Sequence, residues 1–455
     1  MRTPNEQGAA ALPPLLLLLL PLLLVSAPAR GQSPAQAPAP APAPPADSVR
    51  LGALQDSAVA RDPRAAQLAL QRQRTTLTLD NIASEQLPSL AATGQAQYQS
   101  DVTRVGLTLP GGMTVPTPPH DTYDAYLSVR EPLLDPSRAP RRAVARAQLA
   151  QSESTVHTAL HALRQQVNDA FFDALTLQAE QAELDAAITS LRTQLAVASS
   201  RVRNGAALPG DSAAIMAALL RRQQDRAQLD ASRVASLAVL ADLTGHTLAA
   251  QESLARPDLA SAVERTRAAA DTLRARPEYA QYAASRTLLG MQERQVAAAT
   301  RPQLAAFTRA GYGRPGLDML SDRFEWYWLA GVQVQWAPFT WGSNSRDRQS
   351  LDIQQQLVAT EESAFRAALR RSSTRATAQL DFLEHALASD SSIVALREES
   401  AREARLRYGE GVITAADYVD RETDLLNARL TRATHRVQLS QARANYLTML
   451  GIEVQ

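Results

Sequence analysis

Two aspartates near the end of the chain, Asp417 and Asp420, have a residue type and a spacing that could do chemistry. They stand three residues apart, which places both carboxylates on one face of a helix. Where several copies line a passage, clustered carboxylates attract cations and repel anions. A local role is compatible with the same pattern, because Thr414 can cap a helix and Asp417 then occupies the capping-box position. Both roles require a helix that starts just after a turn at Gly411.

Other groups that could carry chemistry are few. His157 and His161 are four residues apart, a spacing that can chelate a metal, but no third ligand accompanies them. No Ser/His/Asp set, glycine-rich phosphate loop or Cys/His cluster stands out. The sequence therefore predicts no catalytic residue, no metal site and no cofactor, and it argues against an enzyme.

The helices and turns that would position the aspartates belong to a pattern that occurs twice in the sequence. Proline and tyrosine landmarks early in the chain recur 214 residues later, and landmarks from Pro132 onward recur 206 residues later. At the second offset Gly205 corresponds to Gly411, and Asp211 corresponds to Asp417. We therefore predict a duplicated chain. Its expected parts are a first structural repeat over 48–245, a connector over 246–270, a second repeat over 271–451 and a C-terminal end over 452–455.

Each repeat is expected to contain an initial helix, a strand, a loop, a second strand, a very long helix, a turn and a returning helix. The long helices are predicted from about 140 to 203 and from about 344 to 408. At 1.5 Å per residue such a helix is roughly 100 Å long, which indicates a coiled coil or a helical bundle rather than an ordinary domain. The chain is rich in alanine, leucine, glutamine and arginine and contains no lysine, a composition typical of long helices.

The strand before Pro338 is the most informative of four predicted strands. From 326 to 336, tryptophan, alanine and valine alternate with tyrosine, leucine, glycine and glutamine. Ten residues span about 33 Å, or about 25 Å of height when tilted, which matches the apolar band of an outer-membrane strand. An ordinary sandwich strand is the alternative. Aromatic residues at the ends of the apolar face predict an aromatic girdle of Trp326, Trp328, Trp336 and Trp341.

Four strands cannot close a barrel, because the smallest outer-membrane barrels need about eight. An open edge in lipid would leave backbone groups unpaired, at a cost of several kcal/mol each. The sequence therefore predicts a barrel that is shared between chains. Two copies would give about eight strands, and three would give about twelve, enough for a water-filled bore.

The first residues are of a different kind. Arg2 precedes an apolar run that small residues follow, which predicts a cleaved secretory signal peptide over 1–31. Residues 32–47 are expected to be a semi-rigid Pro/Ala linker. The chain has no cysteine, so we expect neither disulfides nor a cysteine-linked lipid anchor. The net charge of +1 gives no indication of nucleic-acid binding.

The duplicated plan and the turn pattern Tyr408-x-x-Gly411-x5-Asp417-x-x-Asp420 resemble the TolC-like outer-membrane efflux proteins. The resemblance implies a mainly α fold with a small β part, assembled as a homotrimer. In such a trimer a twelve-stranded outer-membrane β-barrel is continued by a periplasmic α-helical barrel. The implied location is the outer membrane of a Gram-negative-type bacterium, in contact with outer-membrane lipid and extending into the periplasm.

The function that the resemblance implies is a passive exit duct of a tripartite efflux pump or a type I secretion system. The implied partners are a periplasmic adaptor (membrane fusion) protein and an inner-membrane pump of the RND, ABC or MFS type. The alternative is a periplasmic coiled-coil adaptor or structural protein without a channel. The two matched halves argue against that alternative, because an adaptor normally has one helical hairpin flanked by β-rich domains.

The resemblance also assigns roles to residues at the periplasmic tip. Asp417 and Asp420 match the aspartate rings that form the pore constriction of the family. Tyr408 and Asp211 match members of the polar network that holds the tip closed. In the family the pore narrows at this tip and opens by an iris-like rotation of the helix pairs.

Gly205 and Gly411 match the two tip turns, where the adaptor would make contact. The sequence departs from the family at one gate position. The family's network uses an arginine two residues after the second glycine, whereas this chain has Ile413. The sequence therefore raises the question of how the tip is held closed.

Overall fold

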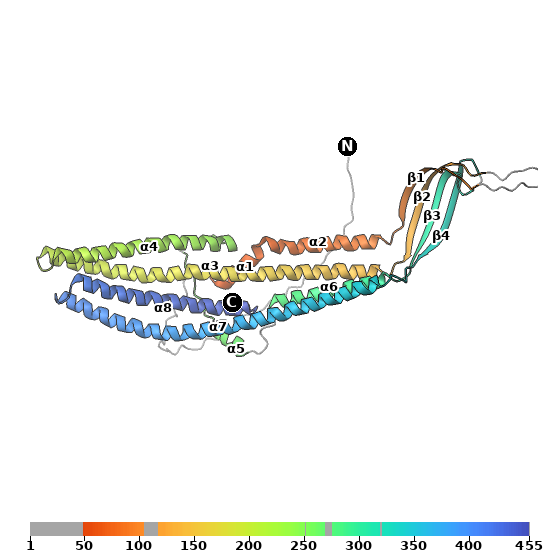
Figure 1. Cartoon of the computed structure of the whole chain (residues 1–455). Coiled ribbons are helices and arrows are strands. Elements are labelled where there is room, and N and C mark those ends of the chain that lie inside the picture. The colour runs from red at the N-terminus through yellow and green to blue at the C-terminus, as the bar shows by residue number, and fades with distance from the viewer. Residues whose placement is uncertain (1–48, 104–116, 251, 269–274, 319–320, 455) are drawn as a thin grey trace, which may run out of the picture. The chain divides into compact units, whose positions relative to one another are not determined.

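The computed structural model describes residues 49–103, 117–250, 252–268, 275–318 and 321–454 (Figure 1). The chain divides into two units, Met1–Ala46 and Asp47–Gln455, and all described residues belong to the second. The predicted signal peptide over 1–31 and the predicted linker over 32–47 therefore lie outside the described residues.

The described part of the chain is mainly helical and contains one small antiparallel sheet, as the sequence predicts. Both halves have the same order of elements: a short helix, a second helix, two strands, a long helix and a returning helix. The elements of the first half are α1 (Leu51–Arg61), α2 (Pro63–Ser84), β1 (Ser89–Tyr98), β2 (Asp121–Leu134), α3 (Arg138–Arg203) and α4 (Pro209–Thr244). Those of the second half are α5 (Ala260–Ala268), α6 (Pro277–Ala298), β3 (Gln303–Arg314), β4 (Glu325–Gln335), α7 (Ser343–Gly409) and α8 (Ala415–Met449).

The two longest helices, α3 and α7, begin and end within a few residues of their predicted bounds. Alanine, leucine, glutamine, glutamate and arginine favour helix at most positions, and no proline follows the first turn of either helix. A glycine with left-handed backbone follows each helix, with φ of 71° at Gly205 and 77° at Gly411. Residues with a side chain are strained at such angles, so glycine ends the helix there. None of the helices that the structure describes is long and apolar enough to cross a membrane.

The returning helices run back beside the long ones. Helix α4 packs on α3 and α8 packs on α7, while α3 also contacts α6 and α8 (Figure 1). Proline at the first positions starts α2, α4 and α6, where its missing N–H leaves no helical hydrogen bond unmade. The two helical hairpins are therefore joined to each other along α3 and α8.

The four strands form one antiparallel sheet in the order β1-β2-β3-β4. The two halves of the chain meet at its centre, where β2 pairs with β3. Strands β1 and β4 are the edges, and neither outer edge has a partner strand within the described residues. Because β2 leads into α3 and β4 leads into α7 after a few residues, the sheet continues directly into the long helices.

The main core surrounds the middle of α3. Phe171 and Phe172 are fully buried there, and their ring centroids lie 5.3 Å apart in an edge-to-face arrangement. Leu54 of α1 and Val263 of α5 belong to the same buried cluster. The sequence analysis predicted only a connector at 246–270 and did not predict α1 or α5, because helices of 11 and 9 residues are too short for their periodicity to be recognised reliably.

Candidate functional site

The turns at the ends of the two helical hairpins close in the same way. The amide of Val412 donates to the carbonyl oxygen of Arg407 at 2.8 Å, and the equivalent bond in the first hairpin has the same length. This is the long hydrogen bond of a Schellman motif around a left-handed glycine. A Cβ at Gly205 or Gly411 would meet no atom within 4 Å, so the φ angle requires glycine and crowding does not. Contact of these turns with an adaptor stays a prediction.

Asp417 begins α8. Its carboxylate accepts hydrogen bonds from the Thr414 amide at 3.1 Å and from the Thr414 hydroxyl at 2.7 Å, and the Thr414 hydroxyl oxygen accepts from the Asp417 amide at 3.1 Å. The predicted capping box is therefore confirmed. Hydrogen bonds from the side chain and then the backbone of Thr414 lower the pKa of the Asp417 carboxyl below its ordinary value. Asp420 lies one turn further along, and both side chains are exposed.

The Asp211 carboxylate accepts a hydrogen bond at the start of α4 and also links the two hairpins. It accepts from the amide of Leu208 at 3.2 Å and from the amide of Ala415 at 3.4 Å. Leu208 is the residue just before α4, whereas Ala415 is the first residue of α8. The two corresponding aspartates have thus diverged. Asp417 bonds within its own hairpin, and Asp211 bonds across to the other.

Tyr408 is buried between the hairpins. Its ring stacks on Tyr418, with centroids 5.4 Å apart and an interplanar angle of 14°. Arg201 of the first hairpin donates to the Tyr408 carbonyl oxygen at 3.2 Å and lies 5.9 Å from the centre of its ring. Burial, and then the nearby charge of Asp211, raise the pKa of Tyr408. Within the described residues its buried hydroxyl has no hydrogen-bond partner, so Tyr408 lies near Asp211 but does not bond to it.

The sequence analysis did not predict Arg201 or Tyr418 as residues of this tip. It also did not predict what Ile413 contacts. Arg201 corresponds to Arg407 at the 206-residue offset, so the duplication itself could have pointed to it. Tyr418 is fully buried, and its hydroxyl donates to Glu422 at 3.1 Å. Ile413, at the position where the family has an arginine, packs against the buried apolar cluster of the tip. The tip of a single chain is thus held by apolar packing at that position.

The pairing register gives the sheet two chemically different faces. Tyr126, Gly311 and Tyr327 stand opposite one another on β2, β3 and β4, and residues at alternate positions share their face. Mainly polar side chains lie on that face: Thr93, Gln95, Asp124, Tyr126, Ser128, Arg130, Arg309, Tyr327, Gln333 and Gln335. Apolar side chains lie on the opposite face: Leu90, Ala92, Leu127, Val129, Trp328, Val332 and Val334.

The apolar face of this sheet is exposed, whereas the apolar face of a sheet in a soluble protein is normally buried against the core. On the apolar face Trp328, Val332 and Val334 are 75%, 62% and 65% exposed. On the polar face Tyr126 and Tyr327 are half-buried. Exposed apolar side chains gathered on one face mark an interaction surface, for a protein partner or for a membrane.

Polar contacts join side chains at the centre of the polar face. The guanidinium of Arg309 lies 4.0 Å from the centre of the Tyr126 ring, and the hydroxyl of Tyr327 donates to the Asp124 carboxylate at 2.5 Å. Gly311 lies between the two tyrosines. A Cβ there would come within 2.7 Å of both the Tyr126 Cβ and the Tyr327 hydroxyl, so the close approach requires glycine.

The four tryptophans of the predicted girdle lie on β4 and just beyond it. Trp326 and Trp328 are in the first part of the strand, and Trp336 and Trp341 follow its end. All four are exposed, Trp341 by 93%. Trp326 packs on Tyr312 with ring centroids 5.0 Å apart, and Trp336 donates its indole N–H to a backbone carbonyl oxygen at 3.0 Å. Aromatic side chains therefore mark both ends of the apolar face, and their place in a membrane stays a prediction.

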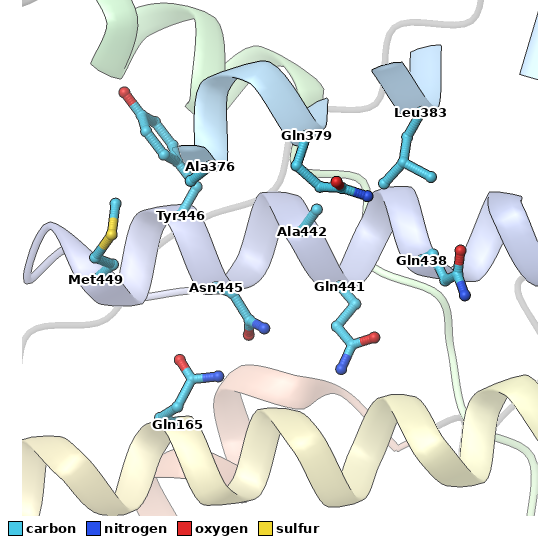
Figure 2. Close-up of a pocket in the computed structure, with 10 residues that line it drawn as sticks. All are labelled: Gln165, Ala376, Gln379, Leu383, Gln438, Gln441, Ala442, Asn445, Tyr446 and Met449. Carbon is cyan, nitrogen blue, oxygen red and sulfur yellow. The ribbon is translucent and has the colours of Figure 1, made fainter. Parts of the chain in front are cut away.

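A groove of about 620 Å³ lies between α3, α7 and α8 (Figure 2). Its wall is rich in amides, and Gln165 on α3 faces Gln441 and Asn445 on α8 (Figure 2). The side chains that line it include no carboxylate, imidazole or guanidinium. Within the described part of the chain no group of three His, Cys, Asp or Glu residues could hold a metal ion. The groove thus offers hydrogen bonds, mainly from amides and from the hydroxyl of Tyr446.

Comparison with known proteins gives matches among solved structures. No protein-family model matches the sequence, and no curated protein matches it either. The outer membrane protein VceC from Vibrio cholerae is 15% identical with a TM-score of 0.63, and the match covers 89% of this chain and 97% of that one. The CmeC outer membrane channel of Campylobacter jejuni is 14% identical with a TM-score of 0.62, covering 88% of this chain and 85% of that one. The open state of the Neisseria gonorrhoeae MtrE outer membrane channel is 18% identical with a TM-score of 0.62, covering 89% and 90%. The chain therefore has the fold of the TolC-like outer-membrane channels.

Proposed function

We propose that this chain is the outer-membrane exit duct of a tripartite efflux pump or a type I secretion system. The observation that carries the proposal is a sheet with an exposed apolar face and, opposite it, a polar face whose central side chains are half-buried. An apolar face is stable against hydrocarbon and a polar face is stable against water, so this sheet fits the wall of a water-filled barrel in a membrane. The fold shared with outer-membrane channels supports the same function.

Three copies of the chain would complete the barrel. The free edges of β1 and β4 carry unpaired backbone groups, which cost several kcal/mol each in lipid. Pairing β4 of one copy with β1 of the next satisfies both edges. A closed ring of three copies then has about twelve strands, which is within the range of outer-membrane barrels and leaves room for a bore. The long helices would continue this ring into the periplasm.

The periplasmic end would be the gate. Asp417 and Asp420 are exposed at the start of α8, so three copies would bring six carboxylates together as the pore constriction. Among the residues that the structure describes, the buried hydroxyl of Tyr408 has no hydrogen-bond partner. We assign Tyr408 and Asp211 to the network that holds this gate closed, because both take part in hydrogen bonds that join the two hairpins.

The partners would be a periplasmic adaptor and an inner-membrane pump of the RND, ABC or MFS type. The turns at Gly205 and Gly411 present the side chains of Leu208 and Val412, which are 74% and 67% exposed. Exposed apolar side chains at two matched turns fit a docking surface for the adaptor. The duct itself would be passive, and the pump would supply the energy.

Outer-membrane vesicles and planar bilayers test the proposal directly. The purified protein is expected to run as a trimer on unheated gels, to shift to a monomer after boiling, and to conduct ions in planar bilayers. A Val332→Asp variant places a charge on the apolar face and is expected to lose membrane assembly, whereas Gln333→Asp on the polar face is expected to keep it. Recovery of the wild type as a soluble periplasmic monomer would contradict the proposal and favour a coiled-coil structural protein.

A further inference from the structure

A second groove lies at the junction of sheet and helices, between the end of α2 and the start of α3. It has a volume of about 410 Å³, and we call it the arginine groove. The side chains that line it are Gln86, Asp135, Arg138, Ala139, Arg142 and Arg146. Three of the six are therefore guanidinium groups, and one is a carboxylate.

Among the side chains that line the arginine groove, three positive charges face one negative charge, that of Asp135. Arg138, Arg142 and Arg146 follow at four-residue intervals on one helix face, where like charges repel one another. Neither Arg142 nor Arg146 has an ion-pair partner among the residues that the structure describes, and the Nε of Arg138 is buried without a hydrogen bond. Asp135 already accepts from Arg141 at 3.1 Å. An anion that enters this groove would meet several unused donors at once.

The arginines also stand at an unfavourable place in their helix. The first turn of α3 contains no acidic residue, and its basic residues face the positive end of the helix dipole. Such an arrangement costs stability in the absence of a bound anion. A phosphate group would be stabilised by the guanidinium groups and by the helix dipole together.

The position of the groove indicates which kind of anion it would bind. Strand β2 ends at Leu134, only four residues before Arg138, so the groove begins at the level where the proposed barrel leaves the hydrocarbon. Leu87, Leu133 and Leu134 border this level and are at least half exposed. Arginine side chains can extend several ångströms along the helix axis toward a membrane interface. The groove therefore combines phosphate donors with apolar side chains that suit acyl chains.

We propose that the arginine groove binds the phosphate group of an anionic phospholipid in the inner leaflet of the outer membrane. This assignment rests on the proposed function, because it requires the sheet to lie in the membrane. The lipid phosphate offsets part of the positive charge of Arg138, Arg142 and Arg146 and fixes the depth at which the sheet sits. It also strengthens the junction between β2 and α3.

Native mass spectrometry of the detergent-solubilised protein tests the site. Dioctanoyl phosphatidylglycerol is titrated into wild type, Arg142→Gln with Arg146→Gln, and a matched control, Arg192→Gln with Arg221→Gln. The control removes the same charge from exposed arginines of α3 and α4 that lie away from the groove. We expect the groove variant to bind the lipid about thirtyfold more weakly than wild type, the loss for two basic residues at an anionic lipid surface. The control is expected to bind like wild type.

Inorganic phosphate serves as the competing probe in the same titration. At millimolar concentration it is expected to leave lipid binding unchanged, because it lacks the acyl chains. Displacement of the lipid by inorganic phosphate would overturn the lipid assignment, and equal lipid affinity of groove variant and wild type would overturn the site. Bilayer conductance of the same preparations reports on the duct separately. Conductance without selective lipid binding would leave the proposed function standing, whereas a wild type that does not conduct would contradict the proposed function itself.

Discussion

The Asp417 carboxylate is held by Thr414 through one oxygen only. Both the Thr414 amide and the Thr414 hydroxyl donate to Oδ2, at 3.1 and 2.7 Å, and within the described residues Oδ1 accepts no hydrogen bond. The side chain is exposed. One residue can therefore start α8 and still present a charged oxygen to a passage. The capping role and the proposed constriction role do not compete.

Replacing Thr414 by alanine removes the cap of α8. The variant is expected to be destabilised by about 1 kcal/mol, since an N-cap hydroxyl contributes roughly that amount. In a thermal denaturation monitored by circular dichroism, Tm should fall by about 1 °C, because the unfolding entropy of so long a chain is large. Thr431→Ala is the matched control, because among the described residues the Thr431 hydroxyl bonds to the preceding turn of the same helix and to no other group. An equal loss of Tm in both variants would contradict the capping role.

The capping box should weaken at acid pH. Hydrogen bonds from Thr414 lower the folded-state pKa of Asp417 below the ordinary value of about 4. The stabilisation is then present above the unfolded pKa and is lost as pH falls through the folded pKa. Hydrogen exchange of the peptide 408–422, corrected for intrinsic rates between about pH 2.5 and 6, should show protection falling below about pH 4. Asp417→Asn should remove this pH dependence, and a wild-type profile in that variant would refute the assignment.

Neutralising the two exposed aspartates should change ion selectivity. With Asp417→Asn and Asp420→Asn, six carboxylates leave the proposed constriction, so cation selectivity and block by multivalent cations should both decrease in planar bilayers. The control pair Asp80→Asn and Asp347→Asn removes the same charge from exposed positions on α2 and α7. Unchanged selectivity in the first pair would leave Asp417 with its capping role alone.

Tyr408→Phe distinguishes a gate contact from simple packing. If the tip rearranges on assembly so that the buried hydroxyl gains an acceptor, its loss should loosen the closed tip and raise single-channel conductance severalfold. If the hydroxyl has no partner in the assembly, its removal should leave conductance unchanged and raise Tm slightly. Tyr418→Phe is the control, because that hydroxyl already bonds to Glu422 within the chain.

Gly311→Ala should disturb the sheet. The added Cβ would lie 2.7 Å from atoms of Tyr126 and Tyr327, and relieving such overlap typically costs about 1–3 kcal/mol. The expected result is a lower temperature for the trimer-to-monomer transition on gels. Gly94→Ala on β1 is the matched control, since a Cβ there meets no atom within 4 Å. A normal transition temperature for Gly311→Ala would show that the two tyrosines can shift apart without cost.

Much of the fold could be predicted because its signals are local. A helix continues while each residue favours it and stops where a left-handed glycine follows, as at Gly205 and Gly411. Trp328, Val332 and Val334 alternate with polar residues. This alternation predicts one apolar and one polar face of the strand without any knowledge of the neighbouring strands. Thr414 and Asp417 are close in sequence, so their capping box was also predictable.

The contacts of the candidate gate depend on distant parts of the chain and were not predictable in this way. Arg201 reaches Tyr408 from 207 residues away, and Asp211 reaches the Ala415 amide from 204 residues away. Ile413 is a further example, because only the folded chain shows that it packs against an apolar cluster. Periodicity, backbone angles and capping belong to neighbours in the chain, so the amino-acid sequence contained the elements, their duplication and their faces. Which side chains meet between the hairpins and across β2, β3 and β4 follows from packing and register, and tertiary structure alone decided those contacts.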